Sequence, residues 1–198
     1  MSEQEALWIQ KALQGDDHAF GNLVEEYQKP VFSLCYRMLG NSKDAEDAAQ
    51  ESFTRAYRYL KKYDTNRSLA TWLLSIAAHY CIDQTRKRRL PTVSTDSIPA
   101  EIISDRNAPN PEREYRQQEK EVLIQNLIDE LSPTDRAAII LRYWHACSEV
   151  EISETLDLTV SAVKSRLYRA RQALAKSYIE SEKSKPLNER RAHESPAF

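Results

Sequence analysis

The sequence predicts an all-α protein with two small helical domains joined by a flexible linker, the C-terminal domain containing a helix-turn-helix. Three observations support this fold class. The 198 residues include only 3 Gly and are rich in strong helix formers. Apolar residues recur at helical spacing along most of the chain, and no segment alternates as a strand would. One central stretch, residues 90–112, breaks the helical pattern and separates two units.

The N-terminal unit, residues 1–89, is expected to be a set of helices. Their expected spans are 2–14, 17–29, 30–40, 42–60 and 71–89, with a polar loop at 63–70. Pro30 suits the first turn of the third helix, and Gly40 suits its end. Ser42 can cap the fourth helix, whose first turn is acidic. The last of these helices ends in the basic run Arg86–Arg89.

The central stretch combines prolines with acidic side chains. They are Pro91, Pro99, Pro109 and Pro111, with Asp96, Glu101 and Asp105. Because prolines at this density favour an extended chain, we expect residues 90–112 to be a mildly acidic linker. The last residues, 181–198, are polar and are expected to form a disordered tail.

The second domain is expected at residues 113–180, with its first helix starting near Pro111. Four apolar residues of that helix fall at helical spacing: Ile124, Leu127, Ile128 and Leu131. The next helix has a cap at Ser132 and a proline, Pro133, at its first position. Its expected buried stripe is Ala137, Ile140, Leu141 and Trp144.

The sharpest local signal is a helix-turn-helix between residues 148 and 174. Ser148 and Glu151 form a capping box at the start of a short helix. The turn Asp157–Thr159 follows, and Thr159 can cap the next helix. That helix has an expected buried stripe of Val163, Leu167, Ala170 and Leu174. Its opposite face carries Ser161, Lys164, Ser165 and Tyr168, flanked by Arg166, Arg169 and Arg171.

This arrangement suits a recognition helix in the major groove of DNA. Short polar side chains near its start can approach base edges, and long basic side chains on its flanks can neutralise phosphates. Residues 158–176 accordingly hold five basic residues and no acidic one, although the net charge of the chain is only −2. The alternative is a surface helix of an ordinary bundle, because two short helices with a three-residue turn are common.

Other classes of protein find little support in the residues. No segment reaches the roughly 18–20 consecutive apolar residues of a membrane span, and no signal-peptide core is present, so we expect a cytoplasmic protein. There is no Walker loop, nucleotide fingerprint or HExxH pair, and the 4 histidines are scattered, so we expect no enzyme and no cofactor. Cys35, Cys81 and Cys147 are expected to be small buried residues.

Three segments, in order, resemble the extracytoplasmic-function (ECF) sigma factors of bacterial RNA polymerase. The core-binding segment of that family is similar to residues 37–41 (RMLGN) and 44–57 (DAEDAAQESFTRAY). Its promoter-melting, minus-ten-reading helix resembles residues 71–78 (TWLLSIAA) with the Asp83 and Arg86–Arg88 that follow. Its minus-thirty-five-reading helix resembles residues 160–171 (VSAVKSRLYRAR). The resemblance covers about residues 16–176.

The resemblance implies three sets of binding residues and no catalytic or metal-binding residue. Core polymerase, through the clamp helices of its largest subunit, would bind Asp44, Glu46, Asp47, Gln50, Glu51 and Phe53. Melted minus-ten DNA would bind Asn66, Arg67, Ser68, Trp72, His79, Asp83, Arg86, Lys87, Arg88 and Arg89. Duplex minus-thirty-five DNA would bind Thr159, Ser161, Ala162, Lys164, Ser165, Arg166, Tyr168, Arg169 and Arg171.

The implied function is to direct core polymerase to specific promoters and initiate transcription, for a stress or envelope-signal regulon. The polymerase flap region and an anti-sigma factor are further implied partners, whereas a small-molecule substrate and direct membrane insertion are not. The chain departs from the family pattern at Ser75 and His79, where Arg and Asn are usual, which indicates a different minus-ten preference. The alternative is a free-standing helix-turn-helix regulator, which explains the C-terminal half equally well but leaves residues 44–89 unexplained.

Overall fold

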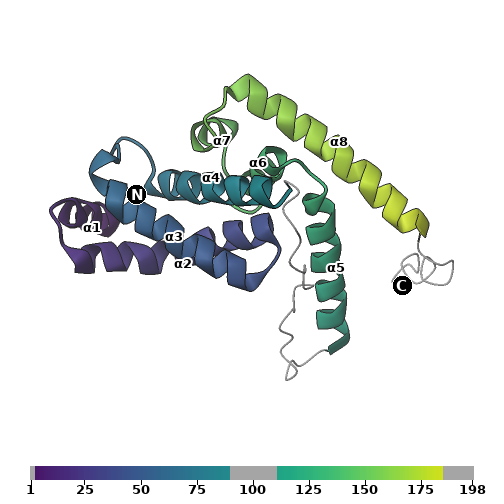
Figure 1. Ribbon diagram of the computed structural model, residues 1–198, viewed down its shortest axis with the longest axis horizontal. Helices are drawn as coiled ribbons and strands as arrows, with labels where there is room; N and C mark the ends of the chain where they lie inside the picture. The colour runs from purple at the N-terminus through teal and green to yellow at the C-terminus, as the bar shows by residue number, and fades with distance from the viewer. Residues whose placement is uncertain (1–2, 90–110, 185–198) are drawn as a thin grey trace.

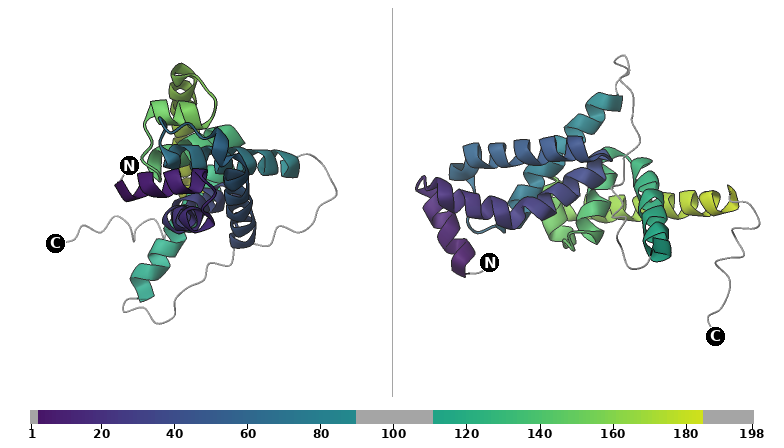
Figure 2. Two further views of the ribbon diagram at one scale, coloured as in Figure 1. Left: turned by 90° about the vertical axis from the view of Figure 1, so that its left-hand side faces the viewer. Right: turned by 90° about the horizontal axis from the view of Figure 1, so that it is seen from below.

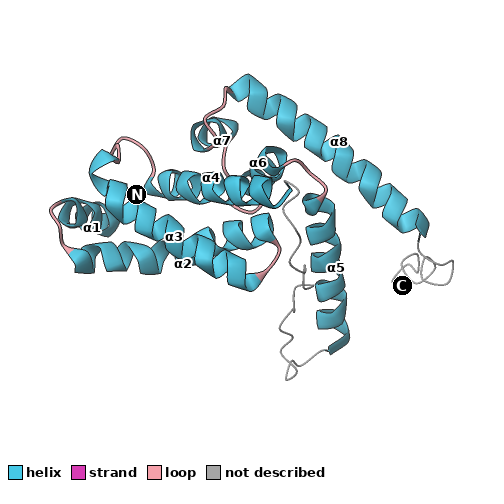
Figure 3. Ribbon diagram, in the orientation of Figure 1, coloured by secondary structure: helices cyan, strands magenta, loops and turns pink. Residues whose placement is uncertain are grey.

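The computed structural model describes residues 3–89 and 111–184, and every regular element in these ranges is helical (Figures 1 and 3). The elements are α1 Glu3–Leu13, α2 Asp17–Leu39, α3 Ser42–Tyr59, the short 3-10 helix η1 Leu60–Lys62, α4 Leu69–Arg89, α5 Pro111–Asp129, α6 Pro133–Tyr143, α7 Glu149–Thr155 and α8 Val160–Ser184. The all-α prediction is confirmed.

Parts of the predicted linker and tail lie outside the described residues, namely 90–110 and 185–198. At its C-terminal end α8 continues to Ser184, past residue 181 where the sequence predicts the tail to begin. In the N-terminal half, α4 begins at Leu69, so the loop after η1 is slightly shorter than expected.

The predicted helix boundary at Pro30 is wrong, because α2 runs unbroken from Asp17 to Leu39 with Pro30 inside it. Pro30 has no amide hydrogen to donate to the carbonyl of Glu26, which makes a helix interior unfavourable for it. The buried positions nevertheless continue in helical register on both sides of it: Leu23, Val31, Leu34, Cys35 and Met38. Burial of this continuous apolar stripe outweighs the local preference of one proline.

The cap of α3 is Asn41 and not the predicted Ser42. The Asn41 backbone is extended, and its side-chain oxygen accepts a hydrogen bond from the Asp44 amide at 2.8 Å. Ser42 lies in the first turn instead, where its hydroxyl donates to the Glu46 carboxylate at 3.1 Å. Gly40 ends α2 as predicted, in the left-handed conformation with φ 79°. The chain therefore reverses between α2 and α3 within two residues.

The N-terminal helices share one core in which α3 contributes small side chains. Its buried residues are Ala45, Ala48, Ala49, Ser52 and Ala56. The distance between two packed helices depends on the side chains at their contact, so this face of small residues lets α2 and α4 pack close to α3. Larger residues of those two helices, such as Leu34 and Leu74, fill the core between them. Burial of this one face of α3 leaves its other faces available for binding.

In the C-terminal half, α6 packs against α7 and α8, and α5 packs against α8. Ile139, Ile140 and Leu141 of α6 are fully buried. The predicted stripe of α5 is only partly buried, since Ile128 and Leu131 lie in the core but Ile124 is 37% exposed. The reason is geometric: α5 projects away from the other helices over much of its length (Figure 1).

The two halves contact each other through α6 and α7 on one side and α2 and α4 on the other (Figures 1 and 2). The central residue of this junction is Arg136, whose side chain is buried. Its guanidinium donates to the Met38 carbonyl at 2.8 Å and pairs with the Asp129 carboxylate at 2.8 Å. One cation thus joins the ends of α2 and α5 to α6.

Replacing Pro30 by alanine should stabilise the protein by about 1–3 kcal/mol, because alanine restores an amide donor toward Glu26 and removes the ring clash. Urea unfolding followed by circular dichroism measures the change. Pro133→Ala is the matched control, since a proline in the first turn of α6 costs no intrahelical hydrogen bond and its replacement should change stability by less than about 0.5 kcal/mol. Equal effects at the two positions would contradict a strained proline inside a continuous helix.

Candidate nucleic-acid and docking surfaces

The helix α8 presents its predicted recognition face to solvent. Solvent reaches all four residues predicted for that face: Ser161, Lys164, Ser165 and Tyr168. Of the predicted buried stripe, Val163, Leu167 and Ala170 lie in the core. Leu174 is partly buried and packs against its edge. The buried stripe fixes the rotation of α8 about its axis, and the predicted polar face therefore points outward.

The turn before α8 sets where this helix begins. Asp157 adopts a left-handed conformation with φ 53°, which Asp tolerates better than most residues. Thr159 caps α8, because its hydroxyl oxygen accepts a hydrogen bond from the Ala162 amide at 3.2 Å. The predicted capping box of α7 is confirmed: the Ser148 amide donates to the Glu151 carboxylate at 2.7 Å. Hydrogen bonds from the backbone and side chain of Ser148 lower the pKa of Glu151.

The basic side chains around the recognition face have different surroundings. Arg169 and Arg171 are exposed, and Lys164 lies 3.6 Å from the Glu149 carboxylate of α7. Arg166 turns toward α6, where its guanidinium donates to Asp135 at 2.8 Å in a half-buried position. Arg166 therefore ties α8 to α6, whereas Arg169 and Arg171 remain available to phosphates.

The loop between η1 and α4 is ordered by its own polar groups. The Asp64 carboxylate accepts hydrogen bonds from the backbone amide of Asn66 at 3.0 Å and from its side chain at 2.9 Å. Tyr63 is buried, and its hydroxyl donates to the Arg67 carbonyl. The three loop residues predicted to hold a base, Asn66, Arg67 and Ser68, are all exposed. The loop thus displays several hydrogen-bonding groups on a braced backbone, as capture of an unpaired base requires.

The predicted minus-ten residues of α4 differ in exposure. Trp72 is half-buried, and its ring centroid lies 5.0 Å from that of Tyr63, so it packs under the loop. His79 is exposed, and its Nδ1 lies 2.8 Å from the Ser75 carbonyl. Asp83 is exposed and lies 3.9 Å from Arg86, one turn further on. His79 and Asp83 are therefore accessible to a ligand, and Trp72 supports the loop.

The C-terminal end of α4 carries the predicted phosphate-binding run. Arg86 and Lys87 are exposed, and the side chain of Arg89 lies outside the described residues. Arg88 forms an ion pair with Asp44 of α3. Burial opposes ionisation of Asp44, but hydrogen bonds from Asn41 and Arg88 outweigh it and hold its pKa below the ordinary value. Two residues predicted for different partners thus neutralise each other here.

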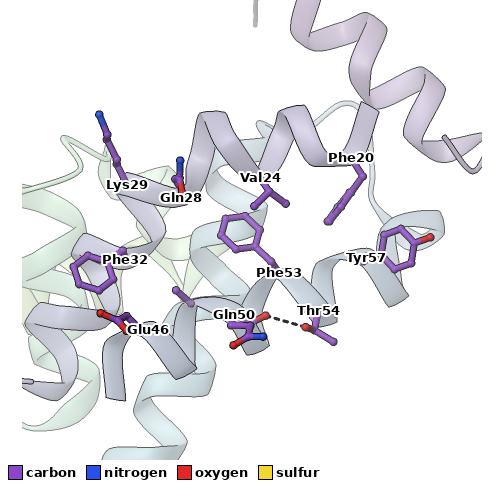
Figure 4. A pocket seen from close by; sticks show the side chains of 11 residues that line it. Phe20, Val24, Gln28, Lys29, Phe32, Glu46, Gln50, Phe53, Thr54 and Tyr57 are labelled. Carbon is purple, nitrogen blue, oxygen red and sulfur yellow. Dashed lines mark hydrogen bonds between the residues drawn. The ribbon is translucent and has the colours of Figure 1, made fainter. Parts of the chain in front are cut away.

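An apolar groove lies between α2 and α3 (Figure 4). It has a volume of about 820 Å³. Three residues predicted to bind core polymerase line it: Glu46, Gln50 and Phe53. Most of the remaining wall is apolar and consists of Phe20, Val24, Phe32 and Tyr57. Such a groove, with a few polar groups such as Lys29 and Glu46 in its lining, suits the apolar face of an amphipathic helix.

The other three residues predicted for this partner lie on a different face of α3. Asp47 is exposed, and Glu51 pairs with Arg55 at 2.7 Å. Asp44 is held by Arg88, as described above. The predicted set therefore divides into a groove face and an acidic face, which the helical spacing places side by side.

A basic and aromatic patch at the end of α3 was missed by the sequence analysis. Residues 55–62 hold four basic residues and no acidic one, which is the signal that could have revealed it. Tyr59 is 51% exposed, with the Lys62 ammonium 5.2 Å from its ring centre. The Arg55 guanidinium lies 4.8 Å from the ring centre of Tyr80 on α4. Cations interleaved with aromatic rings are typical of single-stranded nucleic-acid binding.

Other kinds of site find few candidates among residues 3–89 and 111–184. These residues contain no cluster of three or more His, Cys, Asp or Glu side chains that could hold a metal ion. None of the helices described is both long and apolar enough to cross a membrane. Cys35, Cys81 and Cys147 are free thiols, and all three are buried as predicted. A hydrogen bond to Cys35 and burial raise the pKa of Cys81, which keeps this thiol protonated.

Comparison with known protein families matches both halves of the chain. Residues 23–90 match the family model of Sigma-70 region 2, and residues 121–174 match that of Sigma-70 region 4. The ECF RNA polymerase sigma factor SigW of Bacillus subtilis is 37% identical over 176 residues, which cover 85% of this chain and 93% of that protein. The ECF RNA polymerase sigma-E factor of Escherichia coli is 35% identical and covers 88% of this chain and 95% of that protein.

Solved structures show the same fold. The structure of CnrH in complex with the cytosolic domain of CnrY matches with a TM-score of 0.66 and 23% identity, over 90% of this chain and 99% of that chain. The sigma factor RpoE of Bartonella quintana, in complex with the anti-sigma factor NepR, matches with a TM-score of 0.60 and 20% identity, over 79% of this chain and 94% of that chain.

Replacing Arg166 by alanine should lower the free energy of unfolding by about 1–3 kcal/mol, because Asp135 loses a charge-assisted hydrogen bond in a half-buried position. Arg169→Ala is the matched change at an exposed position. It should leave stability within about 0.5 kcal/mol, weaken binding to any duplex and reduce the salt dependence of binding by about one unit of slope. Thermal unfolding and DNA titrations at several salt concentrations measure both. An Arg166→Ala protein of unchanged stability that no longer binds DNA would place Arg166 on the DNA surface.

Proposed function

The chain belongs to the ECF family of RNA polymerase sigma factors, and on that basis we propose which of its surfaces binds each partner. The protein directs core RNA polymerase to specific promoters for DNA-templated initiation. The observation that carries our assignment is the separation of the predicted sets: the reading face of α8, the loop at 63–68 and the α2–α3 groove lie on different elements. One chain can therefore hold polymerase and two promoter elements together.

We assign duplex minus-thirty-five DNA to the outer face of α8. Ser161 and Ser165 present hydroxyl groups near the start of the helix, and Lys164 lies beside them with a longer reach. The exposed basic residues Arg169 and Arg171 follow along the helix and can neutralise phosphates on either side of the DNA major groove. Lys164 would exchange Glu149 for a base edge when DNA arrives, since its ion pair is exposed and weak.

We assign the melted minus-ten strand to the 63–68 loop and the patch at residues 55–62. Asn66, Arg67 and Ser68 would hydrogen-bond the edge of an extruded base. Tyr59 would stack on a neighbouring base while the cations around it contact phosphates. Both surfaces join at η1, so a single strand can pass from one to the other. Capture of unpaired bases in this way stabilises the open promoter.

We assign the clamp helices of core polymerase to the α2–α3 groove and the acidic face beside it. Phe53, with the other aromatic residues of the groove, would receive apolar side chains of a partner helix. Glu46 and Asp47 would meet basic side chains at its edge, which favours fast and specific association. Apolar side chains exposed on α5 and on the end of α8 offer a second surface for the flap region: Val122, Ile124, Tyr178 and Ile179.

We further propose an anti-sigma factor as a regulatory partner, because solved structures with this fold include a sigma factor bound to one. Sigma factors are non-enzymatic, and in our proposal polymerase supplies all the catalysis, within the cytoplasm, for a stress or envelope-signal regulon. A free-standing regulator explains only α5–α8, and no observation on α2–α4 favours it.

Charge reversal in the groove tests the assignment to core polymerase. Glu46→Lys should weaken binding to purified core polymerase at least about tenfold, or 1.4 kcal/mol, because a basic partner then meets a like charge. Glu26→Lys makes the same change of charge at an exposed position of α2 outside the groove, and should alter the affinity less than about twofold. Fluorescence anisotropy of labelled protein measures both. Equal losses, or none, would remove the groove from the polymerase interface.

Substitution on α8 tests base reading. Lys164→Ala should cost about 1–3 kcal/mol of binding to a promoter duplex and much less on a scrambled duplex, if Lys164 contacts a base edge. Arg171→Ala should instead weaken binding to the promoter duplex and to the scrambled duplex equally, as expected for a phosphate contact. Competition binding at one fixed salt concentration compares them. A Lys164→Ala loss that is the same on both duplexes would make Lys164 another phosphate contact.

A further inference from the structure

Three polar side chains on successive turns of α4 form a row on one side of the helix. Ser75, His79 and Asp83 follow one another at intervals of four residues, so each lies about 6 Å further along the axis than the last. Ser75 is half-buried, and His79 and Asp83 are exposed. The loop at 63–68 precedes this row and the exposed Arg86 follows it, so the row connects the loop that we assign to minus-ten DNA with the basic end of α4.

Hydrogen bonds within α4 decide what Ser75 and His79 can offer to a ligand. The Ser75 hydroxyl donates to the Trp72 carbonyl at 2.7 Å, so its one proton is used and its oxygen can only accept. The His79 Nδ1 lies 2.8 Å from the Ser75 carbonyl. Because a carbonyl oxygen only accepts, Nδ1 is the nitrogen that donates there, and in the neutral ring Nε2 is left as an acceptor. Both side chains therefore offer an acceptor, and no donor, to a ligand.

Asp83 adds a third acceptor, and this one carries a charge. Its carboxylate lies 3.9 Å from the Arg86 guanidinium, and the two side chains are 64% and 62% exposed, so the ion pair is weak and exchangeable. Phosphates repel a carboxylate, which makes the DNA backbone an unfavourable partner for Asp83. On a helix that binds DNA, its favourable partner is a donor on a base edge, such as the exocyclic amine of cytosine. Ser75, His79 and Asp83 are therefore the acceptor row of α4.

The four bases differ in what they present to such a row in the major groove. Adenine offers its N6 amine and cytosine its N4 amine, whereas guanine and thymine offer no hydrogen-bond donor there. Opposite guanine or thymine, lone pairs would meet lone pairs, and polar groups of both molecules would stay unpaired at a cost in affinity. The acceptor row is about 12 Å long, so it reaches at most about four base pairs of duplex.

We propose that the acceptor row selects adenine or cytosine on the strand whose major-groove edges it faces, in the part of the minus-ten element that is still paired where α4 meets it. The loop at 63–68 holds the unpaired bases beyond. The proposal rests on the assignment of minus-ten DNA to this chain and deepens it, because it names the chemical class of the bases that α4 reads.

Selection from a promoter library tests the base preference. Holoenzyme assembled from core polymerase and the full chain binds duplexes with a randomised minus-ten element, and the retained duplexes are sequenced. Wild-type protein should enrich adenine or cytosine at neighbouring positions of one strand. Asp83→Lys, which replaces an acceptor by donors, should shift one of these positions toward guanine or thymine. His79→Phe, which keeps a flat ring without an acceptor, should relax another position about three- to tenfold.

Lys87→Ala is the matched control, at an exposed basic residue of the same helix. It should lower the retention of all sequences alike and leave the base preference unchanged, as expected for a phosphate contact.

A modified base tests the hydrogen bond itself. N6-methyladenine and N4-methylcytosine still pair, but a methyl group replaces the amine hydrogen that faces the major groove. At the position that His79→Phe relaxes, the methyl group should weaken binding of wild-type holoenzyme about three- to tenfold, and binding of the variant less than about twofold.

Three results would overturn the proposal while leaving the sigma function intact. They are enrichment of guanine or thymine by the wild-type protein at the affected positions, base preferences unchanged in both variants, and an equal loss on methylated DNA for wild type and His79→Phe. If wild-type holoenzyme selects no minus-ten sequence at all, the assignment of minus-ten DNA to this chain fails, and the acceptor row fails with it.

Discussion

The buried guanidinium of Arg136 is the interaction on which the arrangement of this molecule depends. From α6 it reaches two helix ends at once, donating to the carbonyl of Met38 at the end of α2 and pairing with the backbone and side chain of Asp129 at the end of α5. A cation is favourable there because helix C-termini carry unsatisfied carbonyls and a partial negative charge. Loss of the side chain would leave those carbonyls buried without a donor. The position of α6, and of the α7–α8 unit packed on it, follows from this contact.

The surfaces that we propose for binding are the helix faces that core packing leaves exposed. Small residues bury one face of α3 against α2 and α4, so its groove and acidic faces are left outward. Val163, Leu167 and Ala170 bury one face of α8, so the reading face points away from the body. Core packing thus sets the rotation of α3 and α8 and decides which of their residues are exposed to the proposed partners.

The local structure was predictable because its determinants are close in sequence. The capping box at Ser148, the Thr159 cap and the buried stripe of α8 all depend on residues within a few positions of one another, and the sequence predicts all three correctly. The helix boundary predicted at Pro30 was wrong because tertiary packing of the apolar stripe from Leu23 to Met38 keeps α2 continuous. The ion pairs Arg88–Asp44 and Arg166–Asp135 join residues far apart in the chain. The sequence pattern therefore predicted exposed basic side chains at Arg88 and Arg166, whereas the structure pairs both with carboxylates.

Amide hydrogen exchange with and without core polymerase tests the central claim most directly, namely that polymerase binds the N-terminal half at the α2–α3 groove. The account predicts slower exchange along α3 and the groove side of α2 in the complex. Protection confined to α8, with α2 and α3 unchanged, would contradict it.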